Sequence, residues 1–259
     1  MNGAVAYLAR SGTRIELLSV LAEGPANGRE LREKLDASRT TVSRTLDGLI
    51  ERRWVTAENN GGPYRLTALG AYVEREFSDL LDSFELGDDL APLLGRVTTE
   101  EFDLDPAALA DADIVEATAE QPLAPVERAM AARQNSETLR EFATVVMRDS
   151  AEMAHERSKN ATDDDTVEIV VDAAVVDAMR EDPAYEDHLE GAMNADGANY
   201  YVHEDLPYLL AVLDDRALFG VVDERGTPLA LIESDSETVY EWAESTFERY
   251  RENADLLAA

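Results

Sequence analysis

The amino-acid sequence predicts a protein of the α/β class that is built from two parts. In roughly the first 85 residues, apolar side chains recur at helical spacing, and only two short strand-like segments interrupt them. From about residue 106 onward, short apolar strands alternate with amphipathic helices, as expected for a mixed sheet covered by helices. The chain has 259 residues, 45% of them hydrophobic, which is enough for two domains with cores of their own.

Two helices are predicted near the start of the chain. Thr13–Glu16 has the T-x-x-E form of a capping box, so we expect it to open a helix that ends near Gly24–Pro25. Asn27 is suited to cap a second, shorter helix, because Glu30 follows it three residues later. A tight turn at Asp36–Ala37 is expected to end this second helix.

A third predicted helix has one apolar and one polar face. Ser38 is its expected cap, and its apolar residues fall at i, i+4, i+7 and i+8, namely Val42, Leu46, Leu49 and Ile50. The residues off this stripe are Arg39, Thr40, Ser43, Arg44 and Asp47. The helix therefore presents mainly arginine and hydroxyl groups on its outward side.

Two short strands and a long helix follow. We expect strands at Arg53–Thr56 and Tyr64–Leu66, joined by the turn-forming segment Glu58–Pro63. Thr67 then caps an amphipathic helix that runs to about residue 85. The order of helix, helix-turn-helix, two-stranded wing and helix is the layout of a winged helix-turn-helix domain, which we assign to residues 1–85.

Residues 86–105 are acidic and irregular in pattern, and we expect them to form a linker. Residues 106–259 are the predicted α/β domain, with a hairpin turn at Asp223–Gly226. Its expected strands lie in ADIVEAT, LREFATVVM, TVEIVVD, NYYVHED, PYLLAVLDD, ALFGVVDE and PLALIES. Its expected helices lie in APVERAMAARQ, SAEMAHERSKN, AAVVDAMRE, AYEDHLEGAMN and SETVYEWAESTFERYRENA.

The chain is strongly negative and contains almost no lysine. The chain holds 55 Asp and Glu against 23 Lys and Arg, a formal net charge of −32, and its lysines are Lys34 and Lys159 alone. This pattern is typical of halophilic proteins in molar intracellular salt, where the Debye length falls to about 3 Å; an acidic mesophilic protein is the alternative. The sequence has neither an apolar run long enough for a membrane span nor a signal peptide, so we expect no membrane contact and a cytoplasmic protein.

The negative charge is unevenly distributed along the chain. Residues 1–75 hold 11 of the basic and 9 of the acidic residues, which leaves 12 basic and 46 acidic residues for the remainder. A surface that must touch phosphate benefits from a low density of acidic residues. The third helix can also enter the major groove of DNA, which is about 12 Å wide. We therefore expect double-stranded DNA as a partner, although the same residues also fit the polar face of an ordinary helical domain. The predicted DNA contacts are Ser38, Arg39, Thr40, Thr41, Ser43, Arg44, Arg52, Arg53, Asn59, Asn60, Tyr64 and Arg65.

The sequence offers few groups for catalysis. Cysteine is absent, which excludes disulfides, thiolate nucleophiles and Cys-based zinc sites. His155, His188 and His203 lack metal-ligand spacing, and the chain has neither a P-loop nor a G-x-S-x-G motif. HERSK around His155 resembles the H-x-K pattern of phosphodiesterases, but Arg157 stands where the lysine should be. We expect no catalytic residues, no metal site and no cofactor, and we interpret Asp163–Asp165 as a solvated loop.

Two sets of segments resemble known regulators. LARSGTRIELLSVLAEGPANGRELREKLDASRTTVSRTLDGLIERRWV and YRLTALG resemble archaeal winged-helix transcriptional regulators. DADIVEATAEQPLAPVERAM, VEIVVDAAVVDAM and the segment from YYVHEDLPYLL to YRENA are similar to the effector domain of the archaeal methanogenesis and filamentation regulator family. This family is abundant in haloarchaea and shares its layout with TrmB-type regulators. The resemblance implies a homodimer, a groove-reading helix at Ser38–Arg52 and a sensing role for residues 106–252.

A second domain without catalytic groups is most simply a sensor or a dimerisation module. Two-fold operators need recognition helices about 34–36 Å apart, so we expect a homodimer. One candidate seam on the long helix comprises Leu69, Val73, Phe77, Leu80, Leu81 and Phe84. A small-molecule effector must bind two arrangements of the dimer with different affinities. For its pocket we consider Tyr200, Tyr201 and His203, although both tyrosines also fit ordinary strand positions.

The predicted function is that of a sequence-specific, DNA-binding transcriptional regulator. Two alternatives remain open at this point: a phosphodiesterase-like hydrolase tethered to DNA, and a winged helix used for protein–protein contact without nucleic acid. Binding to upstream DNA separates the regulator from the protein-contact module. Phosphodiester cleavage that depends on His155 would favour the hydrolase.

Overall fold

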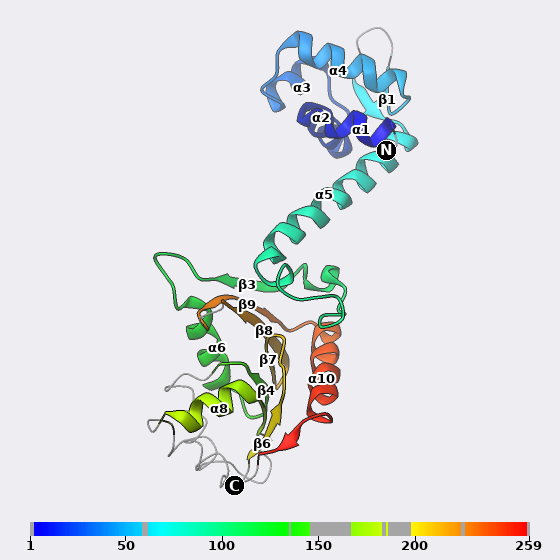
Figure 1. Cartoon of the computed structure of the whole chain (residues 1–259). Helices are drawn as coiled ribbons and strands as arrows, with labels where there is room; N and C mark the ends of the chain where they lie inside the picture. Colours follow the sequence, from blue (N-terminus) through cyan, green and yellow to red (C-terminus); the bar gives the residue numbers. More distant parts are fainter. Residues whose placement is uncertain are drawn as a thin grey trace. The chain divides into compact units, whose positions relative to one another are not determined.

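The computed structural model divides the chain into two compact units, Met1–Glu85 and Leu86–Ala259, with separate hydrophobic cores (Figure 1). The structure describes residues 3–58, 62–134, 136–145, 167–182, 185, 198–223 and 226–257. The α/β class predicted from the sequence is confirmed, because helices are combined with one large mixed sheet.

The first unit consists of short helices and a two-stranded antiparallel sheet, the wing. Its described elements are α1 (Gly3–Ala9), α2 (Gly12–Glu23), α3 (Gly28–Lys34), α4 (Arg39–Glu51), β1 (Val55–Ala57), β2 (Tyr64–Leu66) and the first part of α5 (Ala68–Leu94). Val55 pairs with Leu66 and Ala57 with Tyr64, and Tyr64 exchanges backbone hydrogen bonds of 3.0 and 2.8 Å with Ala26. These bonds tie the wing to the loop before α3.

The starts of α3 and α4 agree with the predicted caps. The Asn27 side chain accepts hydrogen bonds from the N–H groups of Arg29 and Glu30, and the Glu30 carboxylate accepts one from the Asn27 N–H at 2.7 Å. The Ser38 hydroxyl accepts a bond from the Thr41 N–H at 3.1 Å. These bonds satisfy amides that have no partner within the helix, and each cap contributes about 1 kcal/mol of stability.

The start of α2 differs from the prediction. The helix begins at Gly12 and its N-cap is Ser11, whose side chain makes no capping bond, so Thr13 does not form a capping box. The preceding helix, α1, was not predicted, and it ends in a tight turn where the Ser11 N–H donates to the Leu8 carbonyl at 3.0 Å. Because α1 buries only Leu8, its seven residues carry no apolar periodicity.

The core of the first unit is formed by its helices and the wing. Its main members are Leu8, Leu17, Leu18, Leu21, Leu31, Val42, Leu46, Leu49, Trp54, Val55 and Phe77. The predicted stripe on α4 is wrong at Ile50, which is 39% exposed, whereas Thr45 is buried. Successive helical residues are rotated by about 100°, which puts Thr45 on the same side as Val42 and Leu49 and Ile50 at the edge of that side.

A glycine allows α5 to start against the wing. The Thr67 hydroxyl accepts a bond from the Gly70 N–H at 2.9 Å and donates to the Arg53 carbonyl at 2.6 Å. A Cβ atom at Gly70 would lie 1.9 Å from the Trp54 carbonyl oxygen. Only glycine therefore permits this close approach of helix and strand.

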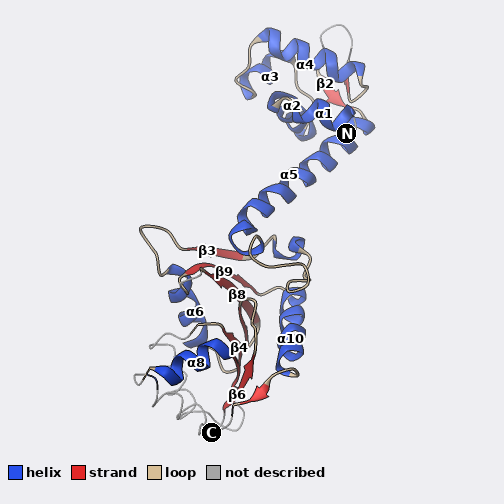
Figure 2. Cartoon of the chain, in the orientation of Figure 1, coloured by secondary structure: helices blue, strands red, loops and turns tan. Residues whose placement is uncertain are grey.

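The described part of the second unit is built around one mixed sheet of eight strands (Figure 2). The strand order is β10-β6-β5-β4-β7-β8-β9-β3, in which β4, β5 and β6 are parallel and the other neighbouring pairs are antiparallel. The strands are β3 (Asp113–Glu116), β4 (Leu139–Ala143), β5 (Val167–Asp172), β6 (Ala198–His203), β7 (Leu209–Leu213), β8 (Arg216–Val222), β9 (Pro228–Ser234) and β10 (Asp255–Leu256).

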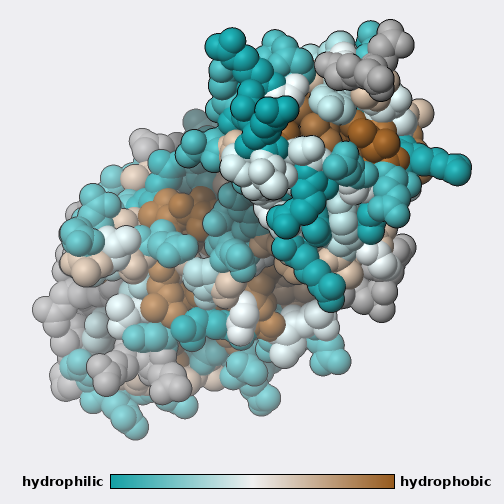
Figure 3. Space-filling view, turned by 90° about the horizontal axis from the view of Figure 1, so that it is seen from above, coloured by the Kyte–Doolittle hydropathy of each residue, from teal (hydrophilic) through white to brown (hydrophobic). Residues whose placement is uncertain are grey.

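Helices cover both faces of this sheet. On one face α10 (Glu237–Arg251) packs through Val239, Ala243 and Phe247. On the other face α6 (Ala124–Gln134) and α8 (Ala173–Glu181) pack through Ala129 and Val176, and Figure 1 shows these two helices opposite α10. The sheet is the middle of three layers. Hydrophilic side chains cover much of the protein face drawn in Figure 3, with hydrophobic side chains gathered in patches.

Residues 86–105 are not the irregular linker that their composition predicts. Helix α5 continues to Leu94, and the 3-10 helix η1 (Pro106–Leu109) follows the stretch. Four apolar residues of the stretch are buried in the core beneath α10: Leu90, Leu93, Phe102 and Leu104. The acidic residues that suggest a linker lie mostly at exposed positions beside or between these four. Two predicted helices, at 150–160 and 184–194, fall outside the described residues apart from Tyr185.

Candidate nucleic-acid interface

The outward side of α4 forms one continuous ridge. Val42, Thr45, Leu46 and Leu49 face the core, so the opposite side of the helix carries the side chains that are spaced four, three and four residues apart. These are Thr40, Arg44, Asp47 and Glu51, all of them exposed, and we call them the α4 ridge. Arg39 and Ser43 are exposed beside it.

Arg39 and Arg44 keep their guanidinium groups available. Neither forms an ion pair or a hydrogen bond with any residue that the structure describes. Arg29 and Arg75 of the first unit are, by contrast, paired, with Glu33 at 2.9 Å and with Glu76 at 2.7 Å. In a chain with 55 acidic residues, two unpaired arginines in the first half of one helix are a distinct positive surface.

The hydroxyl groups of this helix divide into two sets. Ser38 and Thr41 are bonded to each other at 2.9 Å, and Ser38 also caps the helix, so this pair builds the start of α4. Thr40 and Ser43 are exposed, and their hydroxyls have no partner among the described residues. The hydroxyls of Thr40 and Ser43 are therefore the ones that can donate to a phosphate or to a base.

Arg52 and Arg53 are used differently, although they are neighbours. The Arg52 guanidinium carbon lies 3.5 Å from the centre of the Tyr7 ring, and that of Arg14 lies 3.9 Å from it. Arg52 also donates to the Gly48 carbonyl at 3.1 Å. Arg52 thus joins α1 to the end of α4, and its charge is engaged within the domain. Arg53 is exposed and adopts a left-handed backbone conformation with φ 61°.

The wing contributes less free charge than its sequence suggests. Arg65 on β2 forms an ion pair with Glu58, which follows β1. Tyr64 is half-buried and bonded through its backbone to Ala26. The two remaining predicted contacts, Asn59 and Asn60, lie outside the described residues.

The predicted effector residues of β6 lie on two different faces of the sheet. Side chains alternate along a strand, so Tyr200 faces α6 and α8 while Tyr201 and His203 face α10. Burial, and secondarily the Glu141 carboxylate, raises the pKa of Tyr200 to about 12. The His203 ring lies 5.1 Å from that of Tyr250, and its Nδ1 accepts a bond from the Asp205 N–H at 3.2 Å. The three side chains thus lie on two faces of the sheet, and a ligand site at these residues stays a prediction.

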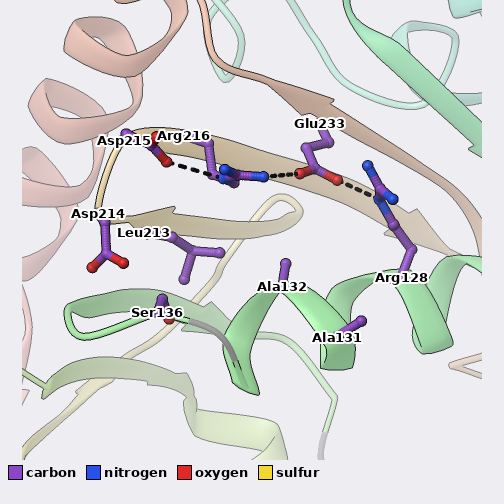
Figure 4. A pocket seen from close by; sticks show the side chains of 9 residues that line it. All are labelled: Arg128, Ala131, Ala132, Ser136, Leu213, Asp214, Asp215, Arg216 and Glu233. Atoms are coloured by element: carbon purple, nitrogen blue, oxygen red, sulfur yellow. Dashed lines mark hydrogen bonds and ion pairs between the residues drawn. The ribbon is translucent and has the colours of Figure 1, made fainter.

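A charged cavity of about 200 Å³ lies between α6 and the β7–β8 turn (Figure 4). Buried Glu233 sits between two guanidinium groups: Arg216 Nη1 at 2.9 Å and Arg128 Nε. Arg216 also bonds Asp215 at 3.1 Å, and Glu233 and Asp215 raise the pKa of this guanidinium. The charged groups thus neutralise one another, which suits a stabilising network.

A smaller cavity of about 60 Å³ lies between α6 and the strands on the same face of the sheet. Its walls include Pro125, Leu209 and Leu231, and it holds the ion pair of Arg133 with Glu141. A third cavity on this face, about 350 Å³ in volume, lies beside α8 and is lined by Val176, Arg180 and Leu257 among others. The sequence pattern predicted none of these cavities, because their residues come from helices and strands far apart in the chain.

Metal binding and membrane insertion find no support in the described residues. These residues contain no group of three or more side chains that could hold a metal ion. None of the helices they form is both long and apolar enough to cross a membrane. His155, His188 and Asp163–Asp165 lie outside the described residues.

Two protein families match the chain. Residues 122–253, about half of its length, match the middle domain of the methanogenesis regulatory protein FilR1. Residues 2–89 match the HVO_A0261 N-terminal domain. Among curated proteins none matches.

Solved structures align with the chain at low identity. The archaeal chromatin protein TrmBL2 aligns over 98% of this chain and 99% of its own, with 8% identity and a TM-score of 0.42. Quinone-bound YodB from B. subtilis aligns over 31% of this chain and 91% of its own, with 20% identity and a TM-score of 0.29. A mutant of MarR from E. coli aligns over 39% of this chain and 76% of its own, with 23% identity and a TM-score of 0.29.

Proposed function

Because the chain belongs to the family of the methanogenesis regulatory protein FilR1, whose middle domain matches residues 122–253, we propose that it is a homodimeric regulator of transcription that binds duplex DNA through its first unit. The observation that carries this proposal is the availability of Arg39 and Arg44 on α4 in a chain of net charge −32. In a protein covered with carboxylates, these two arginines could easily be paired with acids. That they are unpaired is explained if a polyanion must reach them.

In the proposed complex, α4 enters the major groove and the part of the helix before its last turn meets the bases. Arg39 and Arg44 carry donors that match O6 and N7 of guanine or a phosphate, and Thr40 and Ser43 can bond to either. Arg53 is positioned for a phosphate beside the groove. Arg52 and Arg65 support the domain through their internal partners, Tyr7 and Glu58.

The proposed dimer uses apolar side chains that α5 leaves in solvent. Val73 and Phe77 of the predicted seam pack within the first unit's own core instead. The exposed apolar residues of the helix are Leu69, Tyr72, Leu80, Leu81 and Phe84, with exposed fractions of 41–67%. Exposure of these apolar side chains to water is unfavourable, and a second copy of the chain that covers them would remove this cost. Two copies would supply the paired recognition helices that a two-fold operator requires.

We assign an effector-sensing role to the second unit. Its support is the family and the two cavities beneath α6, one charged and one partly apolar. A ligand there would change DNA binding only by its different affinities for two arrangements of the dimer. No described residue favours the hydrolase alternative, and His155 lies outside the described residues.

Fluorescence anisotropy with duplex DNA from upstream of the chain's own gene tests the proposal. We expect Arg44→Ala to weaken binding by at least about tenfold, the equivalent of roughly 1.4 kcal/mol. Arg180→Ala is the matched control, because Arg180 is an exposed arginine of the second unit, paired with Asp177. Circular dichroism of both variants should match the parent protein. Equal affinities of the parent, Arg44→Ala and Arg180→Ala would contradict the proposal and favour a protein-contact role.

A further inference from the structure

The α4 ridge carries an acid where the proposed interface needs positive charge. Asp47 is exposed one turn after Arg44, and its carboxylate forms no ion pair or hydrogen bond with the described residues. Four other acids of the first unit are engaged in ion pairs, namely Glu33 with Arg29, Glu23 with Lys34, Glu58 with Arg65 and Glu76 with Arg75. Asp47 is therefore an unpaired negative charge in the middle of a surface that we propose to lie against phosphates.

A negative charge at this place weakens binding to every DNA sequence, unless a donor on the DNA compensates for it. An ionised aspartate can only accept hydrogen bonds. In the major groove the base donors are the N4 amino group of cytosine and the N6 amino group of adenine, whereas guanine and thymine present acceptors. The carboxylate would thus be tolerated opposite cytosine or adenine and rejected opposite guanine or thymine.

We infer that Asp47 is a specificity-determining residue that accepts a hydrogen bond from an exocyclic amino group in the major groove. The inference rests on the proposed function, since it assumes that α4 lies in the groove. Arg44 and Asp47 are separated by about 4.5 Å along the helix axis, little more than the spacing of about 3.4 Å between base pairs. The recognised site should therefore contain a guanine for Arg44 and, one or two base pairs away, a cytosine or adenine for Asp47.

Glu51 provides a matched control on the same ridge. It carries the same charge as Asp47 and is exposed as well, but it is the last residue of α4. Because the first part of a recognition helix meets the base edges, Glu51 should lie beyond them and act only through its charge.

In the experiment, bound duplexes are selected from a random library by the full chain and by its Asp47→Ala, Asp47→Asn and Glu51→Gln variants. Competition titrations on the selected site then measure the base preferences of each protein. For the parent protein we expect one position of the selected duplexes with a preference of about tenfold for cytosine or for adenine. The base that is selected shows whether the amino group bound by Asp47 is N4 of cytosine or N6 of adenine. Asp47→Ala should lose the preference at that position alone, and Asp47→Asn should shift it toward adenine, which asparagine contacts through N6 and N7. Glu51→Gln should raise affinity for all duplexes and change no base preference.

The outcomes separate the inference from the proposed function. If the parent selects a site and Asp47→Ala selects the same site with unchanged preferences, the assignment of Asp47 is wrong while DNA binding stands. If Asp47→Ala loses all preferences together, its role is structural and the assignment is again wrong. If the parent selects no sequence at all, sequence-specific binding itself fails.

Discussion

At the scale of single residues, Arg53 occupies a backbone position that usually belongs to glycine. It follows the C-cap Arg52 of α4 and has φ 61°, the left-handed conformation that helices commonly reach through glycine. A side chain with a Cβ atom at this conformation costs on the order of 1 kcal/mol. The side chain of Arg53 is exposed and adds nothing to the core, so its retention fits the proposed phosphate contact better than a structural role.

Replacing Arg53 by glycine should separate stability from binding. We expect the free energy of unfolding in urea to stay the same or to rise by up to about 1 kcal/mol, because relief of strain outweighs the greater freedom of the unfolded chain. Affinity for the selected duplex should fall by roughly fivefold, as for the loss of one phosphate contact. Asp36→Gly is the control, since Asp36 is also left-handed, with φ 44°, and carries no positive charge. A loss of affinity in both variants would point to backbone flexibility as its cause.

At the scale of elements, the junction of α5 with the wing depends on the missing side chain of Gly70. Because a Cβ atom there would lie 1.9 Å from the backbone oxygen of Trp54, Gly70→Ala must displace the helix or the strand. We expect a loss of about 3 kcal/mol in the free energy of unfolding of the first unit. Gly87→Ala on the same helix meets no atom within 4 Å and should raise helix stability by roughly 0.5–1 kcal/mol. Equal effects of the two substitutions would contradict the close approach described for Gly70.

A pH-dependent contact joins α10 to the stretch that precedes η1. The Trp242 indole N–H donates to the Asp103 carboxylate at 2.7 Å, and Arg249 lies 3.5 Å away. The hydrogen bond, with help from the guanidinium, lowers the pKa of Asp103 despite partial burial. A carboxyl whose pKa is lower in the folded state stabilises the fold above its unfolded pKa of about 4, and this contribution disappears as pH falls further. It is small, because the carboxylate is about half exposed.

The fluorescence of Trp242 reports on this contact. The chain has two tryptophans, so we would measure emission in a Trp54→Phe background, where the signal comes from Trp242 alone. We expect the emission to change below about pH 4 as Asp103 is protonated. In Asp103→Asn the acceptor oxygen remains but the titration is gone, so this transition should vanish. A transition that persists in Asp103→Asn would assign it to another group.

At the scale of the whole molecule, local periodicity predicted the described elements well, whereas contacts between distant segments were beyond it. The helix at 124–134 and the strand at 167–172 follow from patterns contained within each segment. For the acidic stretch 86–105, composition predicts a linker wrongly, because four buried apolar residues are dispersed among its charges. The α4 ridge follows from helix geometry, but the stacking of Arg52 on Tyr7 depends on a helix 45 residues earlier that no pattern marked.

The proposed assembly of two chains makes the last prediction, and Phe84 is its best test. Phe84 is the most exposed large apolar residue of α5, at 67%, so Phe84→Glu should cost nothing in the isolated chain and should disrupt a seam through burial of its charge. In sedimentation we expect the mass to fall from twice 28.5 kDa to 28.5 kDa. Leu123→Glu, at a residue of the second unit that is 54% exposed, should leave the dimer intact.

Binding to DNA gives this prediction a second measurement. A dimer contacts both half-sites of an operator, and the second contact benefits from a high effective concentration, so its loss should weaken binding by a factor on the order of 10² or more. A duplex that contains one half-site should bind Phe84→Glu as well as it binds the parent protein, because α4 is untouched. If Phe84→Glu remains dimeric and binds the full operator normally, the seam lies on another surface, and the exposed side chains of α5 need a different partner.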